Sequence, residues 1–201
     1  KYGGIKMSRI RYGIKSVYYA VITEGEDGNV TYATPVALPG AKSISLSAEG
    51  DKLEEYADNA KWYVENVNQG FSGDLVVEDT ADCDKFLETV LGLVKNSTDG
   101  TVLEKADAQT KEFALGFQFE LKGGADGENG KRTWLYRCVA SRPDVSGDTK
   151  ESSITVATNT INITAMPRLS DSAVKISATA GAKAYENWFQ AVVEQTSQKS
   201  N

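Results

Sequence analysis

The stretch Lys111–Arg142 constrains the fold more strongly than any other part of the chain. From Phe113 to Leu121, apolar side chains occupy every second position. This period of two is typical of a half-buried strand and excludes a helical stripe. Four glycines in Gly123–Gly130 then favour a turn, because glycine readily takes positive φ values. The segment Arg132–Ala140 resumes the alternation and predicts a return strand with one face formed by Trp134, Tyr136, Cys138 and Ala140. We therefore predict a long antiparallel hairpin at the centre of the fold.

Further β-rich segments flank this hairpin in the sequence. Val17–Thr23 and Val30–Thr34 are separated by a polar turn at residues 25–29 and predict a second hairpin. Phe71–Glu78 predicts another strand, in which Gly73 marks a bulge or a close approach of two backbones.

The most β-branched part of the chain is Ser153–Ala165. Its apolar residues lie on even positions at Ile154 and Val156 and on odd positions from Ile161 onward. One extra residue would reconcile the two phases, so we expect a bulge near Thr158–Thr160. A last strand is predicted at Val174–Thr179.

A polar stretch separates two other predicted strand segments, one around Ser43–Ser47 and one from Trp62 onward. Apolar residues alternate with Ser43, Ser45 and Ser47, which gives one apolar face and one hydroxyl face. The second segment begins at Trp62. Between them we expect a projecting loop at about residues 47–62, centred on Asp51–Ala60, and long projecting loops of compact domains usually have a function.

At about residues 81–91, apolar residues recur at the three- and four-residue spacing of a helix. The predicted core stripe is formed by Cys83, Phe86, Leu87, Val90 and Leu91. Asp79 or Thr80 can cap the first turn, and Gly92 suits the position after the last turn.

These elements amount to about eight to ten strands and one helix, and the chain of 201 residues is long enough to bury a sizeable core. We predict a mainly β fold, an antiparallel β-sandwich or partly closed barrel with one flanking α-helix. The whole chain, 1–201, is expected to form a single domain. Its N-terminal arm spans residues 1–16 and its C-terminal arm about 183–201.

Composition excludes several classes of function. The net charge of −6 argues against general affinity for nucleic-acid phosphates. No apolar run is long enough to span a bilayer, so we expect no membrane partner. Histidine is absent, which removes the commonest general base and metal ligand. Cys83 and Cys138 form no metal-ligand cluster; we expect buried thiols, and a disulfide between them remains open.

No candidate active site remains once each acidic cluster is compared with a structural explanation. The carboxylates around Glu54 and Glu55 lie on a predicted surface loop, where solvated charge is expected. The acids beside Cys83 suit a helix start, and Asp126–Asn129 suits a turn better than a Ca²⁺ loop. No glycine motif for phosphate is present. We therefore predict no enzymatic activity and no cofactor, metal or catalytic residue.

An ordered series of sequence motifs resembles one protein family. The motifs are Arg11–Ala20, Tyr32–Gly40, Tyr56–Asn59 ahead of Trp62-Tyr63, Gly70–Leu75, Lys111–Phe117 and Tyr185–Phe189. Together they resemble the major tail proteins of long-tailed, non-contractile bacteriophages of Gram-positive hosts, the phi-thirteen-type family. The similarity runs from about Arg9 to Phe189. The chain departs from the pattern in Lys1–Lys6, which precede Met7.

This resemblance implies a structural virion protein that self-assembles into stacked hexameric rings. The rings would form the tail tube through which DNA passes without specific binding. Assembly would take place in the host cytoplasm, and the other partners would be the tape measure, tail terminator and distal tail proteins. The arms and the projecting loop supply the inter-subunit candidates, which are Arg11, Tyr12, Lys15, Asp51, Leu53, Glu54, Glu55, Tyr56, Asp58, Trp188 and Phe189. The candidates for lining the lumen are Ser43, Ser45 and Ser47.

The main alternative is a monomeric β-sandwich binding module, either an adhesin or a carbohydrate-recognising domain. Exposed loop aromatics would serve either function. The two hypotheses differ in their assembly, because only a tube subunit polymerises.

Overall fold

The computed structural model describes residues 10–24, 30–122, 130–145, 147 and 156–195. The basic segment before Ile10, the predicted turn at residues 25–29, most of the turn Gly123–Gly130, Ile154 and the tail after Gln195 lie outside the described residues.

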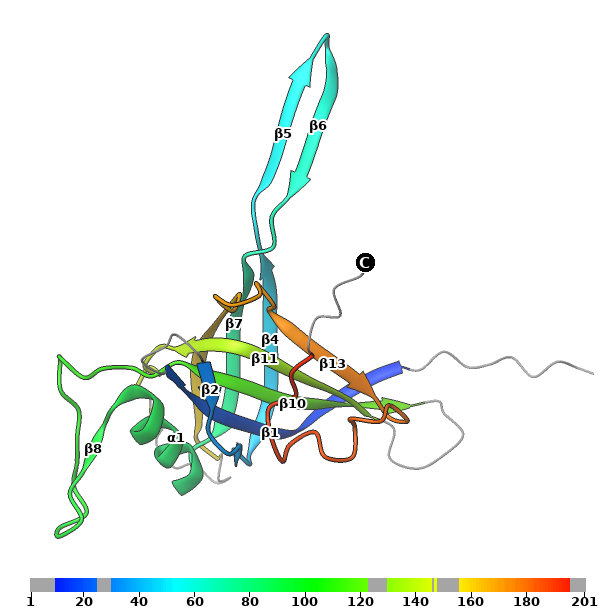
Figure 1. The fold of residues 1–201 in the computed structure, drawn as a ribbon. Coiled ribbons are helices and arrows are strands. Elements are labelled where there is room, and N and C mark those ends of the chain that lie inside the picture. The colour runs from blue at the N-terminus through cyan, green and yellow to red at the C-terminus, as the bar shows by residue number, and fades with distance from the viewer. Residues whose placement is uncertain (1–9, 25–29, 123–129, 146, 148–155, 196–201) are drawn as a thin grey trace, which may run out of the picture.

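Strands dominate the described chain, together with one short helix (Figure 1). The strands are β1 (Ile10–Glu24), β2 (Val30–Tyr32), β3 (Val36–Ala37), β4 (Ala41–Glu49), β5 (Lys52–Ala57), β6 (Ala60–Asn66), β7 (Gly70–Glu78), β8 (Val94–Lys95), β9 (Val102–Leu103), β10 (Phe113–Lys122), β11 (Gly130–Ala140), β12 (Thr158–Met166) and β13 (Lys175–Thr179). The helix is α1 (Ala81–Leu91). The predicted mainly β fold with one flanking helix is confirmed.

Nine strands form one antiparallel sheet in the order β2-β1-β10-β11-β12-β7-β4, with β3 paired to β1 and β13 paired to β11. The remaining strands form two separate pairs, β5-β6 and β8-β9. The large sheet curls until β4 lies beside β1, but no ladder joins these two strands in the part of the chain described. The sheet is therefore not a closed barrel.

The concave face of the curled sheet holds the main core. It receives the alternating side chains Phe113, Leu115 and Phe117 of β10, and α1 packs against it. The ring of Phe86 meets the rings of Tyr19 and Phe113 edge to face, at centroid distances of 4.9 and 5.4 Å. This burial of large apolar side chains is the main source of stability for the fold.

The helix begins and ends where its sequence predicts. The Thr80 hydroxyl accepts a hydrogen bond of 3.3 Å from the main-chain N–H of Cys83, and Gly92 takes a left-handed conformation at the C-terminus. Of the predicted stripe, the buried members are Cys83, Phe86, Val90 and Leu91, whereas Leu87 is half-buried.

Gly73 brings two strands together, as the sequence predicted. It lies in β7 at a φ of 153°, opposite Leu46 of β4, and a Cβ atom here would lie 1.9 Å from the carbonyl oxygen of Ser45. The register of β7 is regular at this residue. Gly73 therefore permits a close approach and forms no bulge, which keeps β4 hydrogen-bonded to β7.

The predicted bulge in Ser153–Ala165 and the predicted single face of the return strand were both wrong. Residues Thr158–Ala165 pair with β7 in a continuous register, so no bulge lies at Thr158–Thr160; the strand begins there, and Val156 lies outside it. In the return strand β11, the register shifts between the pairs Phe113/Cys138 and Leu115/Leu135. Because of this shift, Trp134 faces the convex side of the sheet while Cys138 joins the main core. The predicted single face of four residues is therefore split.

Candidate assembly surfaces

Strands β5 and β6 form a long hairpin that projects away from the body of the molecule (Figure 1). Asp58 and Asn59 connect them with φ values of 52° and 59°, the backbone of a two-residue type I′ turn. The sequence predicts a projecting loop here, with Trp62 in a strand of the body. The correction is that the projection is a β-hairpin, which includes Trp62 and extends to Asn66.

The hairpin continues the ladder between β4 and β7. At its root, the N–H groups of Val67 and Gln69 donate to the carbonyl oxygens of Asp51 and Glu49, each at 2.9 Å. The side-chain amide of Gln69 also donates to the Asp51 carboxylate at 3.2 Å. Asp51, predicted to contact another subunit, therefore stabilises the root of the hairpin.

Large apolar side chains on the hairpin have no packing partner in the body. Trp62 is 75% exposed and Tyr56 is 65% exposed, and Leu53 and Tyr63 are exposed as well. Every residue of β6 is exposed. Several exposed large apolar side chains on one projecting element make the hairpin a candidate interaction surface.

The charges on the hairpin differ between its two faces. On one face, Glu54 accepts from Lys52, from Lys61 at 2.8 Å and from the Tyr56 hydroxyl at 3.0 Å. The hydrogen bond from Lys52, followed by those from Lys61 and Tyr56, lowers the pKa of Glu54. We call this the paired face, because its carboxylate is already neutralised.

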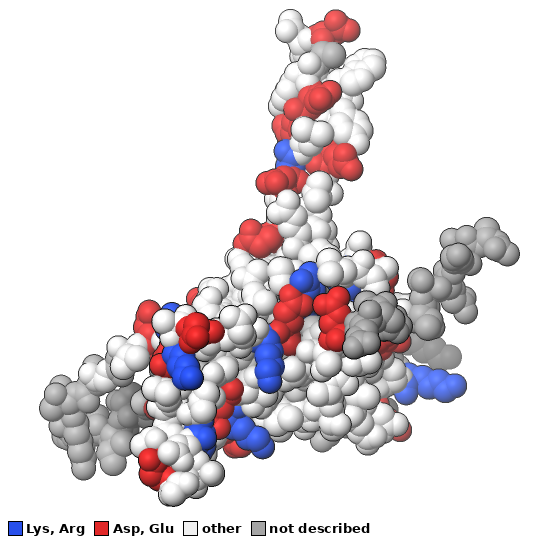
Figure 2. Space-filling view, turned by 60° about the vertical axis from the view of Figure 1, so that its left-hand side comes forward, with Lys and Arg blue, Asp and Glu red and all other residues white. Residues whose placement is uncertain are grey.

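The other face, which we call the acidic face, has no lysine or arginine. The register places on it Leu53, Glu55, Tyr63 and Glu65. The Tyr63 hydroxyl donates to the Glu65 carboxylate at 2.8 Å, while Glu55 projects without a cation on the same face. Asp58 adds another acid at the tip. Acidic side chains follow the hairpin along its length in the space-filling view (Figure 2).

The three predicted lumen serines belong to a wider polar surface on β4, β7 and β12. Ser45 pairs with Asp74, which pairs with Asn162, and the Asn162 amide donates to Asp74 at 3.2 Å. The neighbouring row contains Ser47, Ser72 and Thr164. Directly opposed residues in a ladder share a face, so this surface consists of Ser43, Ser45, Ser47 and Glu49 of β4, Ser72, Asp74, Val76 and Glu78 of β7, and Thr158, Thr160, Asn162 and Thr164 of β12. Its centre contains the Asp74 carboxylate and no cation, Glu49 and Glu78 lie at its two ends, and Lys42 pairs with Glu78 at 3.8 Å.

The predicted N-terminal candidates lie in a strand and not in a free arm. Arg11, Tyr12 and Lys15 belong to β1 and pair with β10. Lys15 forms an ion pair of 2.7 Å with Glu120 on that strand. Arg11 lies 4.6 Å above the ring of Phe119. The length of β1 was underestimated because glycine and serine at positive φ interrupt its alternation, at Gly13 and Ser16.

The predicted C-terminal candidates pack against their own chain. Trp188 is 1% exposed, and its carbonyl oxygen accepts a hydrogen bond of 2.9 Å from the Trp134 indole. Phe189 stacks on Tyr18 at a centroid distance of 4.5 Å. The Arg132 guanidinium lies 3.9 Å from the ring centroid of Tyr185 and donates to that residue's carbonyl oxygen. These aromatics cover the convex face of the sheet, and Trp188 is buried within its own chain.

The described residues contain no group of three or more acids or cysteines that could hold a metal ion. Cys83 and Cys138 are buried free thiols, and burial raises the pKa of both. Among the described residues, α1 is far too short to be a membrane-spanning helix, and no other helix could cross a membrane.

Comparison with known proteins does not assign the chain to a family. No family model matches the chain, and no curated protein matches it. The geometry of the hairpin and of the polar sheet surface must therefore support any functional conclusion.

Sequence reasoning missed two residues of the hairpin surface, Trp62 and Tyr63. The available signal was Asp58-Asn59, a favoured type I′ pair, between two segments of strand-forming residues. Had this pair been interpreted as a hairpin turn, both aromatics would have been placed on the projection.

Proposed function

We propose that this chain is a structural subunit that assembles into stacked hexameric rings, forming the tail tube of a long-tailed, non-contractile bacteriophage. In this proposal DNA passes through the lumen, and the protein is a component of the virion with no enzymatic activity. The tape measure, tail terminator and distal tail proteins would be its other partners.

The main support for the proposal comes from the β5–β6 hairpin. It extends the β4–β7 ladder into solvent, yet exposes Trp62, Tyr56 and Tyr63. An isolated two-stranded hairpin is only marginally stable in water. Contact with a neighbouring subunit would cover the aromatic side chains and stabilise the hairpin, as expected for an element that joins subunits.

The polar surface of β4, β7 and β12 supports the second part of the proposal. Six copies arranged around an axis with this surface inward would present hydroxyl, amide and carboxylate groups to the lumen. Binding of duplex DNA requires cations that replace its counterions, and Ser43, Ser45, Asp74 and Asn162 provide none. DNA would therefore slide along this wall without adhering to it.

Assembly can be tested by light scattering coupled to size-exclusion chromatography over a range of protein concentrations, followed by negative-stain microscopy. The proposal predicts growth from monomers to rings and tubes as concentration rises. A single monomeric species at every concentration would contradict it.

A monomeric binding module is the second candidate, and the exposure of Trp62 and Tyr56 is the observation that favours it. Aromatic side chains on a projecting element can stack on sugar rings or insert into a receptor. The same experiment separates the two functions, because a binding module stays monomeric while its hairpin remains available to a ligand.

A further inference from the structure

The concave side of the sheet has an open end that the core does not fill. It forms a hollow of about 310 Å³ between β1, β4, β7, β10, β11 and β13. Its apolar wall includes the rings of Phe71, Phe117 and Phe119. We call it the cationic hollow, because its charged lining residues are Arg11, Lys131 and Lys175, with no carboxylate among them.

The three cations have no acidic partner in the described chain. Arg11 lies over Phe119, and the Lys175 ammonium lies 4.3 Å from the ring centroid of Phe71. None of the ion pairs between described residues involves Arg11, Lys131 or Lys175. Three like charges around an apolar wall repel one another. They suit an occupant that combines carboxylates with aromatic or aliphatic side chains.

The acidic face of the β5–β6 hairpin has this chemistry. Glu55 and Glu65 supply two carboxylates, and exposed Leu53 and Tyr63 supply apolar surface. The paired face does not suit the hollow as well, because Lys52 and Lys61 already neutralise Glu54.

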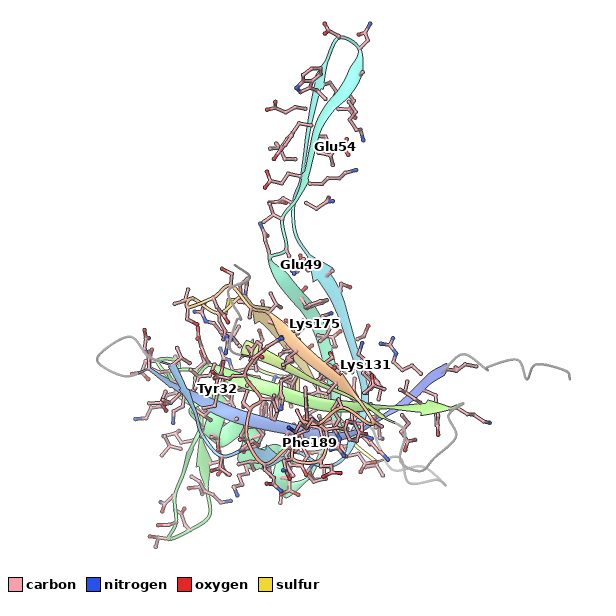
Figure 3. The ribbon with its side chains drawn as sticks, turned by 45° about the vertical axis from the view of Figure 1, so that its right-hand side comes forward. Tyr32, Glu49, Glu54, Lys131, Lys175 and Phe189 are labelled. Atoms are coloured by element: carbon pink, nitrogen blue, oxygen red, sulfur yellow. The ribbon has the colours of Figure 1, made fainter. Side chains whose placement is uncertain are left out.

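The hairpin cannot fill the hollow of its own subunit. Figure 3 shows Lys131 and Lys175 on the body, below the hairpin root at Glu49, whereas Glu54 lies far out along the hairpin. The strands run directly away from the body. A hairpin in the hollow must therefore come from another copy.

We propose that the acidic face of the hairpin docks in the cationic hollow of a neighbouring copy. This inference rests on the proposed self-assembly and specifies the contact that joins the copies. The hairpin and the hollow are different surfaces, so each subunit has one hairpin that can dock and one hollow that can receive a hairpin. Such a head-to-tail contact repeats from copy to copy until a ring closes or a filament forms.

The test uses two full-length charge-reversed variants. The hairpin variant carries Glu55→Lys and Glu65→Lys, and the hollow variant carries Lys131→Glu and Lys175→Glu. In either variant alone, like charges meet at the contact, and we expect the critical concentration for assembly to rise at least about tenfold. The matched control, Glu54→Gln on the paired face, should change it by less than about twofold.

The decisive sample is an equimolar mixture of the two variants. Each hairpin then finds a hollow of opposite charge on the other variant, so the mixture should assemble although neither variant does so alone. Recovery on mixing also excludes misfolding as the cause of either defect, and unchanged thermal unfolding of each variant provides an independent check.

The outcomes separate the inference from the proposed function. If the wild-type protein assembles and the two variants assemble equally well, the docking contact is wrong and the tube proposal stands. Variants that fail alone and stay unassembled when mixed also overturn the docking contact. If the hollow variant loses only the binding of another protein or anion, the hollow has a different occupant and the inference fails. A wild-type protein that stays monomeric overturns the tube proposal itself.

Discussion

Replacing Trp188 with alanine tests whether the C-terminal segment belongs to its own subunit or to a neighbour. The Trp188 side chain is 1% exposed and packs in a cluster with Trp134, Ala114 and Ala20. Truncation of a buried tryptophan to alanine costs about 3–5 kcal/mol. The carbonyl oxygen of residue 188 would remain to accept from the Trp134 indole, so the expected loss comes from packing alone.

Trp188→Phe provides the matched control. The Trp188 indole N–H is buried and has no hydrogen-bond partner among the described residues. An unpaired buried donor costs about 1–3 kcal/mol, and its removal offsets much of the apolar area lost with the smaller ring. We expect Trp188→Phe to change the free energy of unfolding by less than about 1 kcal/mol.

Both free energies can be measured by urea unfolding, monitored by circular dichroism at concentrations below the assembly threshold. A loss of about 3 kcal/mol or more in Trp188→Ala, independent of protein concentration, is expected from intrachain packing. A loss well under 1 kcal/mol together with failed assembly would refute it. That result would show that Trp188 contacts a neighbouring subunit, as the sequence analysis predicted.

Three further predictions concern the hairpin, the pH dependence of stability and the lumen. Replacing Lys52–Asn66 with a short glycine turn should leave the free energy of unfolding within about 1 kcal/mol, because the hairpin packs on nothing in the body, yet it should abolish assembly; tubes formed by this deletion variant would contradict the role of the hairpin. The hydrogen bond from Arg168 lowers the pKa of Asp171 in the folded state. The stability that this Arg168–Asp171 interaction provides is therefore present above about pH 5 and is lost as pH falls through the depressed pKa of Asp171. The difference in free energy of unfolding between wild type and Asp171→Asn should therefore be constant from about pH 7 to 5 and shrink below about pH 4, and a difference unchanged in acid would refute this. Ser45→Lys should make assembled tubes bind duplex DNA in a salt-sensitive manner, whereas Ser45→Gln should not; equal DNA binding by both variants would remove Ser45 from the lumen wall.

Local sequence patterns were sufficient to predict most of the sheet and the helix. The alternation from Phe113 to Leu121 correctly identified β10 as a strand. The expectation that only one face is buried was wrong, because the C-terminal aromatics cover the second face at Ala114. Thr80 and Gly92 marked the ends of α1 through hydrogen bonding and backbone conformation that depend only on nearby residues.

Predictions that depend on register or on distant segments were less accurate. The shift in β11 reversed the face of Cys138, and such a shift depends on the pairing with β10 and not on the sequence of β11 alone. Trp188 was assigned to an interface because its burial depends on Trp134, which is distant in the sequence. The cationic hollow requires Arg11, Lys131 and Lys175 to converge from three strands. No local pattern in the sequence indicates that convergence.

A three-dimensional reconstruction of the concentrated protein by electron cryomicroscopy tests the central claim most directly. The account predicts stacked six-fold rings in which each β5–β6 hairpin contacts a neighbouring copy and the surface around Ser45, Asp74 and Asn162 lines a continuous lumen. A protein that remains a dispersed monomer, or an assembly in which the hairpins point into solvent and another surface lines the lumen, would contradict it.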